Sequence, residues 1–316
     1  MSPDSPFPRG PAAARWDIVG LGVCTIDILI RVPELPSSEG VQRASQTCLQ
    51  GGGPVATALA AAARLGAKTL MLDRQGDDWR GDLIRNGLEE LGVMTDLCER
   101  VPGASSALAS IWVRERDGAR TIAYDPGSLD PLQPADLPTG VIEQARILHT
   151  NGRHQPAWFA AARRARDAGV AVSFDGGANR FRPEMREYLP WIDLAIVSLD
   201  WAERFSGCPD PIEAGKRIRA AGPSLVAVTD GTRGSWVAHE DSWFHQPAFR
   251  VPDTIDTTGC GDVYHGAFLA GWAWGWSLQR CAQLASAAAA INSRAMGGRG
   301  CLPSLTEAET FLRQAR

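Results

Sequence analysis

The chain lacks the features that mark several classes of protein. Its 7 cysteines among 316 residues are scattered and form no Cys-x-x-Cys pair, so neither a zinc site nor a disulfide framework is indicated. A reducing cytoplasm is the compartment that we expect for such a chain. No apolar run reaches the roughly 18 residues that a membrane-spanning helix needs. The formal net charge is only -4, which gives no support to a nucleic-acid or membrane partner.

The order of apolar runs predicts one α/β domain over residues 16–316, after a flexible Pro- and Ala-rich tail at 1–15. Buried strands are expected at 17–23, 69–72, 147–150, 170–174, 194–197 and 225–229. Helices are expected at 55–65, 79–91, 156–167, 183–189, 211–221, 278–295 and 304–313. This alternation predicts a three-layer α/β/α sandwich with a mostly parallel sheet, whose ligands bind at the carboxyl ends of the strands.

Two other segments predict a small second sheet. Residues 29–50 alternate loosely in polarity and contain prolines, and residues 105–125 contain two strand-like runs around an Asp-Gly turn. We expect these segments to pair as a β lid over the main domain. A short antiparallel pair is also expected, between 235–237 and 248–251.

The segment 256–262, Asp-Thr-Thr-Gly-Cys-Gly-Asp, carries the most specific chemical signal. Glycines at 259 and 261 let backbone N–H groups approach a ligand, because no Cβ stands in the way. The helix expected to follow adds free N–H groups and the positive end of its dipole. Such an anion hole, with Asp262 at its mouth, indicates phosphoryl transfer to a hydroxyl. The alternative is an acid that only complements the helix dipole.

The chain resembles the PfkB/ribokinase-like carbohydrate kinases from Asp17 to Leu312. Segment 256–262 matches the C-terminal signature of that family, with Cys260 where Ala is usual. The run from Gly52-Gly53 to Arg64-Leu65-Gly66 matches the N-terminal signature. Two signatures in the right order, roughly 200 residues apart, form a specific signal.

The resemblance implies a ribokinase-like fold and transfer of the γ-phosphoryl group of ATP to a hydroxymethyl group, with magnesium. Its base would be Asp262, and its anion hole would be the backbone of Gly259, Cys260 and Gly261. The implied residues for substrate are Asp27, Gly52, Gly53, Thr57 and Arg153. The implied residues for ATP are Thr229, Gly231, Gly234 and Asn292.

Within the family, the nearest resemblance is to the sulfofructose-kinase-like branch. It rests on 51–57, 245–249 and the Met-Gly-Gly-Arg run at 296–299. Thr57 stands where most relatives have Asn and that branch has Thr. Of the three residues with which the branch binds a sulfonate, Arg153 is present, whereas Val41 and Tyr124 replace a Lys and an Asn. A guanidinium at 153 suits an anionic group, and the alternative is a solvated loop arginine.

The sequence does not determine which residues hold two possible ions. The family's Asn-x-x-Glu motif for magnesium would fall at 198–201, where neither residue is present, so that Asp200, Glu203 or the phosphates and water alone would hold the ion. A potassium site at Asp256 and Thr258 is a further candidate, although Cys301 replaces the Ser of potassium-dependent relatives.

Three functions compete at this point. The first is a kinase of a small ketose or hexose, and the second is a nucleoside kinase with Trp112 and Tyr124 as stacking residues. The third is a sugar-binding regulator without catalysis, prompted by the missing Asn-x-x-Glu motif. In each case we expect a homodimer formed through the lid, because exposed strand edges need covering.

Overall fold

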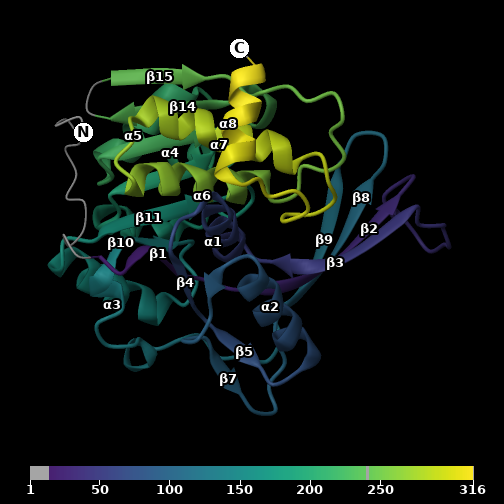
Figure 1. Ribbon diagram of the computed structural model, residues 1–316, viewed down its shortest axis with the longest axis horizontal. Helices are drawn as coiled ribbons and strands as arrows, with labels where there is room; N and C mark the ends of the chain where they lie inside the picture. Colours follow the sequence, from purple (N-terminus) through teal and green to yellow (C-terminus); the bar gives the residue numbers. More distant parts are fainter. Residues whose placement is uncertain (1–13, 240–241, 316) are drawn as a thin grey trace.

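The computed structural model describes residues 14–239 and 242–315, and it has a large central sheet between two layers of helices (Figure 1). The expected three-layer α/β/α sandwich with a β lid is confirmed. Residues 1–13 of the expected tail lie outside the described residues, and Arg15 N donates to Gln144 O at 2.8 Å. Within the described ranges, no helix combines the length and apolarity that a membrane crossing requires.

The central sheet has nine strands in the order β15-β14-β13-β12-β11-β10-β1-β4-β6. Its strands are β1 (Trp16–Leu21), β4 (Thr69–Leu72), β6 (Val93–Met94), β10 (Ala145–Thr150), β11 (Ala171–Gly176), β12 (Leu194–Ser198), β13 (Leu225–Thr229), β14 (Ser235–His239) and β15 (Ser242–Gln246). All neighbouring pairs are parallel except β13–β14 and β14–β15. Every strand of this sheet except β14 therefore runs in the same direction, and their carboxyl ends meet at one edge of the sheet.

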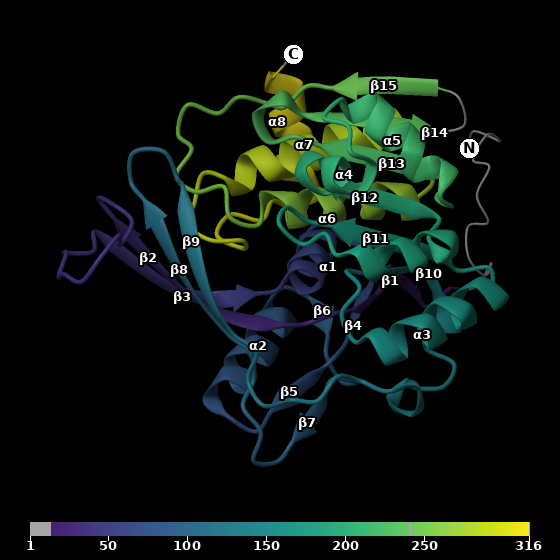
Figure 2. The ribbon, with the colours of Figure 1, turned by 180° about the vertical axis from the view of Figure 1, so that it is seen from behind.

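Each face of the sheet has its own hydrophobic core, because successive side chains of a strand point to opposite faces. In β1, Ile18 belongs to one core and Val19 to the other. The first core is covered by α1 (Pro54–Leu65), α2 (Trp79–Glu90), α6 (Cys260–Ala273), α7 (Leu278–Asn292) and α8 (Leu305–Gln314). The second is covered by α3 (Gln155–Asp167), α4 (Leu199–Ser206) and α5 (Pro211–Ala220), as Figure 2 shows from behind.

Local sequence explains where several helices begin and end. Helix α1 starts with Pro54 at its first position and stops at Gly66, whose φ of 107° suits glycine. Helix α8 begins with the capping box of Ser304 and Glu307. Short 3-10 turns fill several connections: η1 (Pro134–Asp136), η2 (Ile142–Gln144), η3 (Pro183–Glu187), η4 (Leu189–Trp191) and η5 (Gly231–Arg233).

The lid is a four-stranded sheet in the order β3-β2-β8-β9, beside the carboxyl edge of the central sheet (Figures 1 and 2). Its strands are β2 (Thr25–Val32), β3 (Gln46–Gly52), β8 (Leu108–Arg114) and β9 (Arg120–Asp125). The first lid strand begins at residue 25 rather than near 29, so Asp27 belongs to the lid. A separate parallel pair consists of β5 (Arg74–Gly76) and β7 (Glu99–Val101).

Two expected elements were wrong. Residues 248–251 form no strand, and the antiparallel partner of β14 is β15, where Trp236 stacks on His245. The expected segment lies between Pro247 and Pro252, which limit backbone pairing. The helix expected at 183–189 is two 3-10 turns, each with a proline at its start.

Candidate active site

A pocket of about 1600 Å³ lies at the carboxyl edge of the central sheet, with the lid as one wall. The sheet contributes residues at or just after strand ends: Asn151, Asp175, Ser198 and Thr229. The lid contributes Asp27 and several apolar side chains, including Ala109 and Ile111. The pocket floor is the segment from Thr257 to Asp262, which leads into α6. The predicted strand-end location therefore matches the position of this pocket.

The segment that is expected to form the anion hole is the first turn of α6. Gly259 is the N-cap with φ of 71°, and its carbonyl accepts from Val263 N at 2.8 Å. Cys260 N donates to Thr257 O at 3.3 Å, so that amide is used within the turn. Helix geometry leaves the amides of Gly261 and Asp262 without an intrahelical acceptor. These two N–H groups, at the positive end of the helix dipole, are the donors available to a phosphoryl group.

Asp262 lies in this pocket among other charged side chains. Burial raises the pKa of its carboxyl group to about 7, and the negative charge of Asp175 adds to this effect. Arg180 and Arg120 act in the opposite direction, because their positive charges favour the carboxylate. A carboxyl group tuned in this way can take up a proton near neutral pH.

Asp27 points into the pocket from lid strand β2 and is 8% exposed. Burial raises the pKa of this carboxyl, while the hydroxyl of Thr25, which donates to Oδ1 at 2.7 Å, lowers it. Gly52 lies against the carboxylate so closely that a Cβ at that position would overlap it. The glycine therefore makes room for the acid that is expected to hold sugar hydroxyls.

The loop before α6 is fixed by buried polar side chains. Asp256 accepts from the backbone N of Thr258 and of Gly297, each at 2.8 Å. Asn292 donates to the carbonyls of Gly297 and Gly298 and accepts from Cys301 N. The structure therefore uses Asn292 to hold the 297–301 segment. This residue is fully buried outside the pocket, and its neighbours Ala289, Ala290 and Ser293 line the wall instead.

The other residues expected to bind ATP lie together. Thr229, Gly231 and Gly234 line the pocket at the end of β13 and in the following turn. Gly234 has φ of 95° and leaves no space for a Cβ, because Gln246 O lies against it. This turn faces the same cavity as the α6 N-terminus, so that one ligand can span both.

The expected substrate residues divide into two groups. Gly53 and Arg153 line the pocket, together with Asp27. Thr57 and Gly52 do not, since Thr57 is 1% exposed and accepts from Arg299 Nε at 3.2 Å. Arg153 Nη2 donates to Tyr124 Oη at 3.2 Å, and its guanidinium lies 5.5 Å from the centre of that ring. Val41, by contrast, is fully exposed.

Two pocket side chains have roles other than acid–base chemistry. The thiol of Cys260 donates to Ala289 O at 3.4 Å, and burial raises its pKa to about 12, so it remains neutral. His265 lies 3.6 Å from Asp175 through Nε2, and burial lowers its pKa. Both side chains support the wall of the site.

Several charged residues in or behind the pocket were not predicted as site residues, among them Asp175, Arg180, Arg120 and Arg299. Asp175 ends a buried strand, which is the same signal that pointed to strand-end ligands elsewhere. Arg180 follows it and donates to Asp175 at 3.4 Å. Arg120 reaches from lid strand β9 to Thr257 Oγ1 at 3.4 Å, and no local pattern marks it. Arg299 was noted only as part of a motif, without a role.

A sandwich with a β lid above a helix N-terminus defines the ribokinase-like class of folds, and known structures agree. The ribokinase of Arabidopsis thaliana, solved with ribose and ATP, matches with a TM-score of 0.81 over 94% of this chain and 99% of its own, at 24% identity. The chain belongs to the pfkB family of carbohydrate kinases, whose family model matches residues 17–305.

Curated relatives of similar length agree with this assignment. The ATP-dependent ribose-1-phosphate kinase of Halopiger xanaduensis is 27% identical over 296 residues, which cover 93% of this chain and 97% of that protein. Fructokinase-2 of Zea mays is 28% identical over 330 residues, with 94% of each chain covered. These comparisons establish the family and do not single out the sulfofructose-kinase-like branch.

Proposed function

We propose that this ATP-dependent sugar kinase phosphorylates a primary hydroxyl of a small sugar of the ketose or hexose type. One observation supports this most. Asp262 stands beside the open amides of α6, in the same pocket as Asp27, so a hydroxyl held by Asp27 would share one cavity with a base and an anion hole. The names of two relatives, a ribose-1-phosphate kinase and a fructokinase, also favour a small sugar.

In the proposed reaction, Asp262 accepts the hydroxyl proton as the sugar oxygen attacks the γ-phosphorus of ATP. The bond from that phosphorus to the oxygen of ADP breaks. The amides of Gly261 and Asp262 donate to the phosphoryl oxygens, where negative charge is concentrated during transfer. Arg120 and Arg180, which line the same pocket, add positive charge to that region. The lid excludes water, which would otherwise compete as acceptor.

Magnesium supplies charge neutralisation of the phosphates when it is bound. Asp175 fits this role: it is a pocket carboxylate whose described contacts are long, 3.4 Å to Arg180 and 3.6 Å to His265. Asp200 fits less well, because it already accepts from Asn179 N and Arg204. Among the described residues, no three His, Cys, Asp or Glu side chains form a metal cluster. We therefore propose one protein carboxylate, with phosphates and water as the other ligands.

A potassium ion at Asp256 and Thr258 is a separate candidate. Both carboxylate oxygens of Asp256 accept backbone N–H groups, and Thr258 Oγ1 has no hydrogen-bond partner in the described structure. Turnover in potassium chloride and in tetramethylammonium chloride tests the requirement. Equal rates would exclude it.

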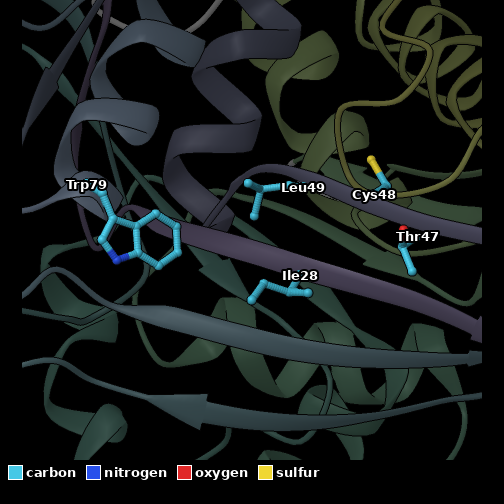
Figure 3. A pocket seen from close by; sticks show the side chains of 5 residues that line it. All are labelled: Ile28, Thr47, Cys48, Leu49 and Trp79. Carbon is cyan, nitrogen blue, oxygen red and sulfur yellow. The ribbon is translucent and has the colours of Figure 1, made fainter.

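We also propose a homodimer through the outer face of the lid. A hollow of about 270 Å³ lies there. Figure 3 shows the side chains that line it, with Trp79 at one end and Thr47 and Cys48 at the other. Leu49 is 50% exposed and Trp79 is 52% exposed, so a second copy would cover apolar surface. Light scattering of the wild type and of Leu49→Glu tests this arrangement. A monomeric wild type would contradict it.

The proposed function is tested by an ADP-release assay with sugars, sugar phosphates, sugar acids and nucleosides as acceptors. We expect turnover with a sugar or sugar derivative and none with nucleosides. Asp262→Asn should lower kcat by about 100-fold or more while ATP binding persists. Turnover with nucleosides alone would make the protein a nucleoside kinase. Binding of sugars without any turnover would favour a regulator.

A further inference from the structure

Arg299, a half-buried residue, places its guanidinium behind the sugar side of the pocket. Its Nη2 donates to Gly52 O at 2.7 Å, its Nε donates to Thr57 Oγ1 at 3.2 Å, and its backbone N donates to Gln50 Oε1 at 2.7 Å. Nη1 is buried and has no hydrogen-bond partner among the described residues. No described carboxylate forms an ion pair with this side chain. A buried cation without a paired anion is costly, which suggests a role beyond stability.

The position of Arg299 joins the two halves of the site. Gly51 lies against Nη1, and Gly52 lies against Asp27, so closely that a Cβ on either glycine would overlap its neighbour. On the other side, Gly298 lies against Gly259, the N-cap of α6. One short segment therefore contacts the turn behind Asp27 and the turn that carries the anion hole.

We propose that Arg299 is a positioning residue for the sugar. It keeps the 51–53 turn and Asp27 at a fixed position relative to the N-terminus of α6. This inference rests on the proposed kinase function. Because Thr57 is engaged by Arg299, neither side chain lines the pocket. Recognition on this side then falls to Asp27 and to Gly53. The hydroxyl of Thr57 accepts from Nε at 3.2 Å, which links the 51–57 segment to the 296–299 segment.

The charge of Arg299 also affects Asp27. Burial raises the pKa of the Asp27 carboxyl, whereas the Thr25 hydroxyl and the Arg299 charge lower it. The groups that face Asp27 are Thr25 on its own strand, Gly52 on β3, Arg299, and at longer range Asp262 on α6. An ionised Asp27 accepts hydrogen bonds from sugar hydroxyls more strongly than a protonated one.

Two substitutions separate the geometry from the charge. Arg299→Gln removes the positive charge, so the KM for the sugar should rise about tenfold or more, with little change in the KM for ATP. The Asp27 step on the acidic side of kcat/KM for the sugar should also move to higher pH, because Asp27 then protonates more readily, while the acidic step of kcat, which reports Asp262, stays in place. Arg299→Lys keeps the charge and loses the fork of donors, so KM should rise while the limb stays near its wild-type position.

Thr57→Val provides a milder test, because it removes only the acceptor of Nε. It should raise the sugar KM severalfold at every pH. Arg294→Gln is the matched control, since Arg294 lies on the same segment but pairs with Asp253 and contacts Phe311. This control should keep the wild-type KM and the wild-type limb.

The outcomes distinguish this inference from the proposed function. If wild-type protein phosphorylates no sugar, the proposed function fails and this inference fails with it. If the wild type is active and Arg299→Gln retains its sugar KM and acidic limb, only the role of Arg299 is overturned. Equal losses for sugar and ATP in all three variants, with a lower Tm, would show a purely structural residue. If Arg299→Gln does not fold, the Lys and Thr57→Val variants decide.

Discussion

Gly259 packs directly against Gly298, with no space for a side chain between them. The contact joins the start of α6 to a segment 39 residues later in the chain, counted from 259 to 298. Because Gly259 also has φ of 71°, both its conformation and its surroundings require glycine. This contact, together with the hydrogen bonds of Asp256, fixes the orientation of the open amides in α6.

Replacement of Gly259 by Ala should therefore damage both the fold and catalysis. A Cβ would overlap Gly298 and strain the left-handed backbone, so we expect a loss of about 1–3 kcal/mol in the free energy of unfolding. We also expect a large fall in kcat, since the amides would move. Urea unfolding and steady-state kinetics measure the two effects. An active and fully stable variant would contradict this account of the turn.

Gly261 should behave differently, although it lies only two residues away. A Cβ there meets nothing within 4 Å in the protein alone, and the position is helical. Gly261→Ala should keep or raise stability by up to about 1 kcal/mol, because alanine favours a helix. Its Cβ would nevertheless stand beside the open amides, so kcat should fall. A variant with normal kcat would show that the phosphoryl group does not approach at this point.

The pH dependence of the reaction should show an acidic limb. The raised pKa of Asp262, about 7, means that the base is protonated and inactive as the pH falls below this value. Arg180→Gln removes a positive charge that lowers this pKa, so the limb should move to higher pH. Arg204→Gln, which removes an exposed partner of Asp200, should leave it in place. A profile of kcat against pH at saturating sugar measures the midpoints, and a flat profile between pH 5 and 8 would exclude Asp262 as the titrating base.

The same shift predicts that catalysis is achieved at a cost in stability. The folded state holds a proton on Asp262 up to about pH 7, whereas the ordinary pKa of an aspartic acid carboxyl is 3.8. Its stabilising contribution is therefore present at low pH and is lost as the pH rises towards 7. Asp262→Asn should be more stable than the wild type at pH 8, by about 1–2 kcal/mol, and the difference should shrink towards pH 4. Denaturant titrations at several pH values test this, and a less stable variant at pH 8 would contradict it.

The parts of the fold that follow from local sequence were predictable. Strand β1, helix α1 with its Pro54 start and Gly66 stop, and the capping box of α8 all depend on neighbouring residues. The signature at 256–262 was recognisable for the same reason. Strand β15 was missed because its sequence, Ser-Trp-Phe-His-Gln, has only two adjacent apolar residues and therefore neither an apolar run nor an alternation.

The remaining parts depend on long-range packing. Arg299 reaches Thr57 across 242 positions of sequence, and Arg120 reaches Thr257 across 137. Nothing near either arginine in the sequence indicates its partner. Asn292 was expected to contact ATP, but its amide is used to hold the 297–301 segment, which only the packed structure shows. A polar side chain in a buried helix can form hydrogen bonds with the backbone of a neighbouring loop as readily as with a ligand.

The pocket takes its lining from Val23 to Ser293, and so from nearly the whole length of the chain. No fragment of the protein contains a working site. A ligand that touches the lid, the strand ends and α6 together would resist the unfolding of all three at once. Enzymatic activity is for this reason a strict reporter of complete refolding. A refolding sample can regain the spectroscopic signal of its helices while the assay still detects no turnover.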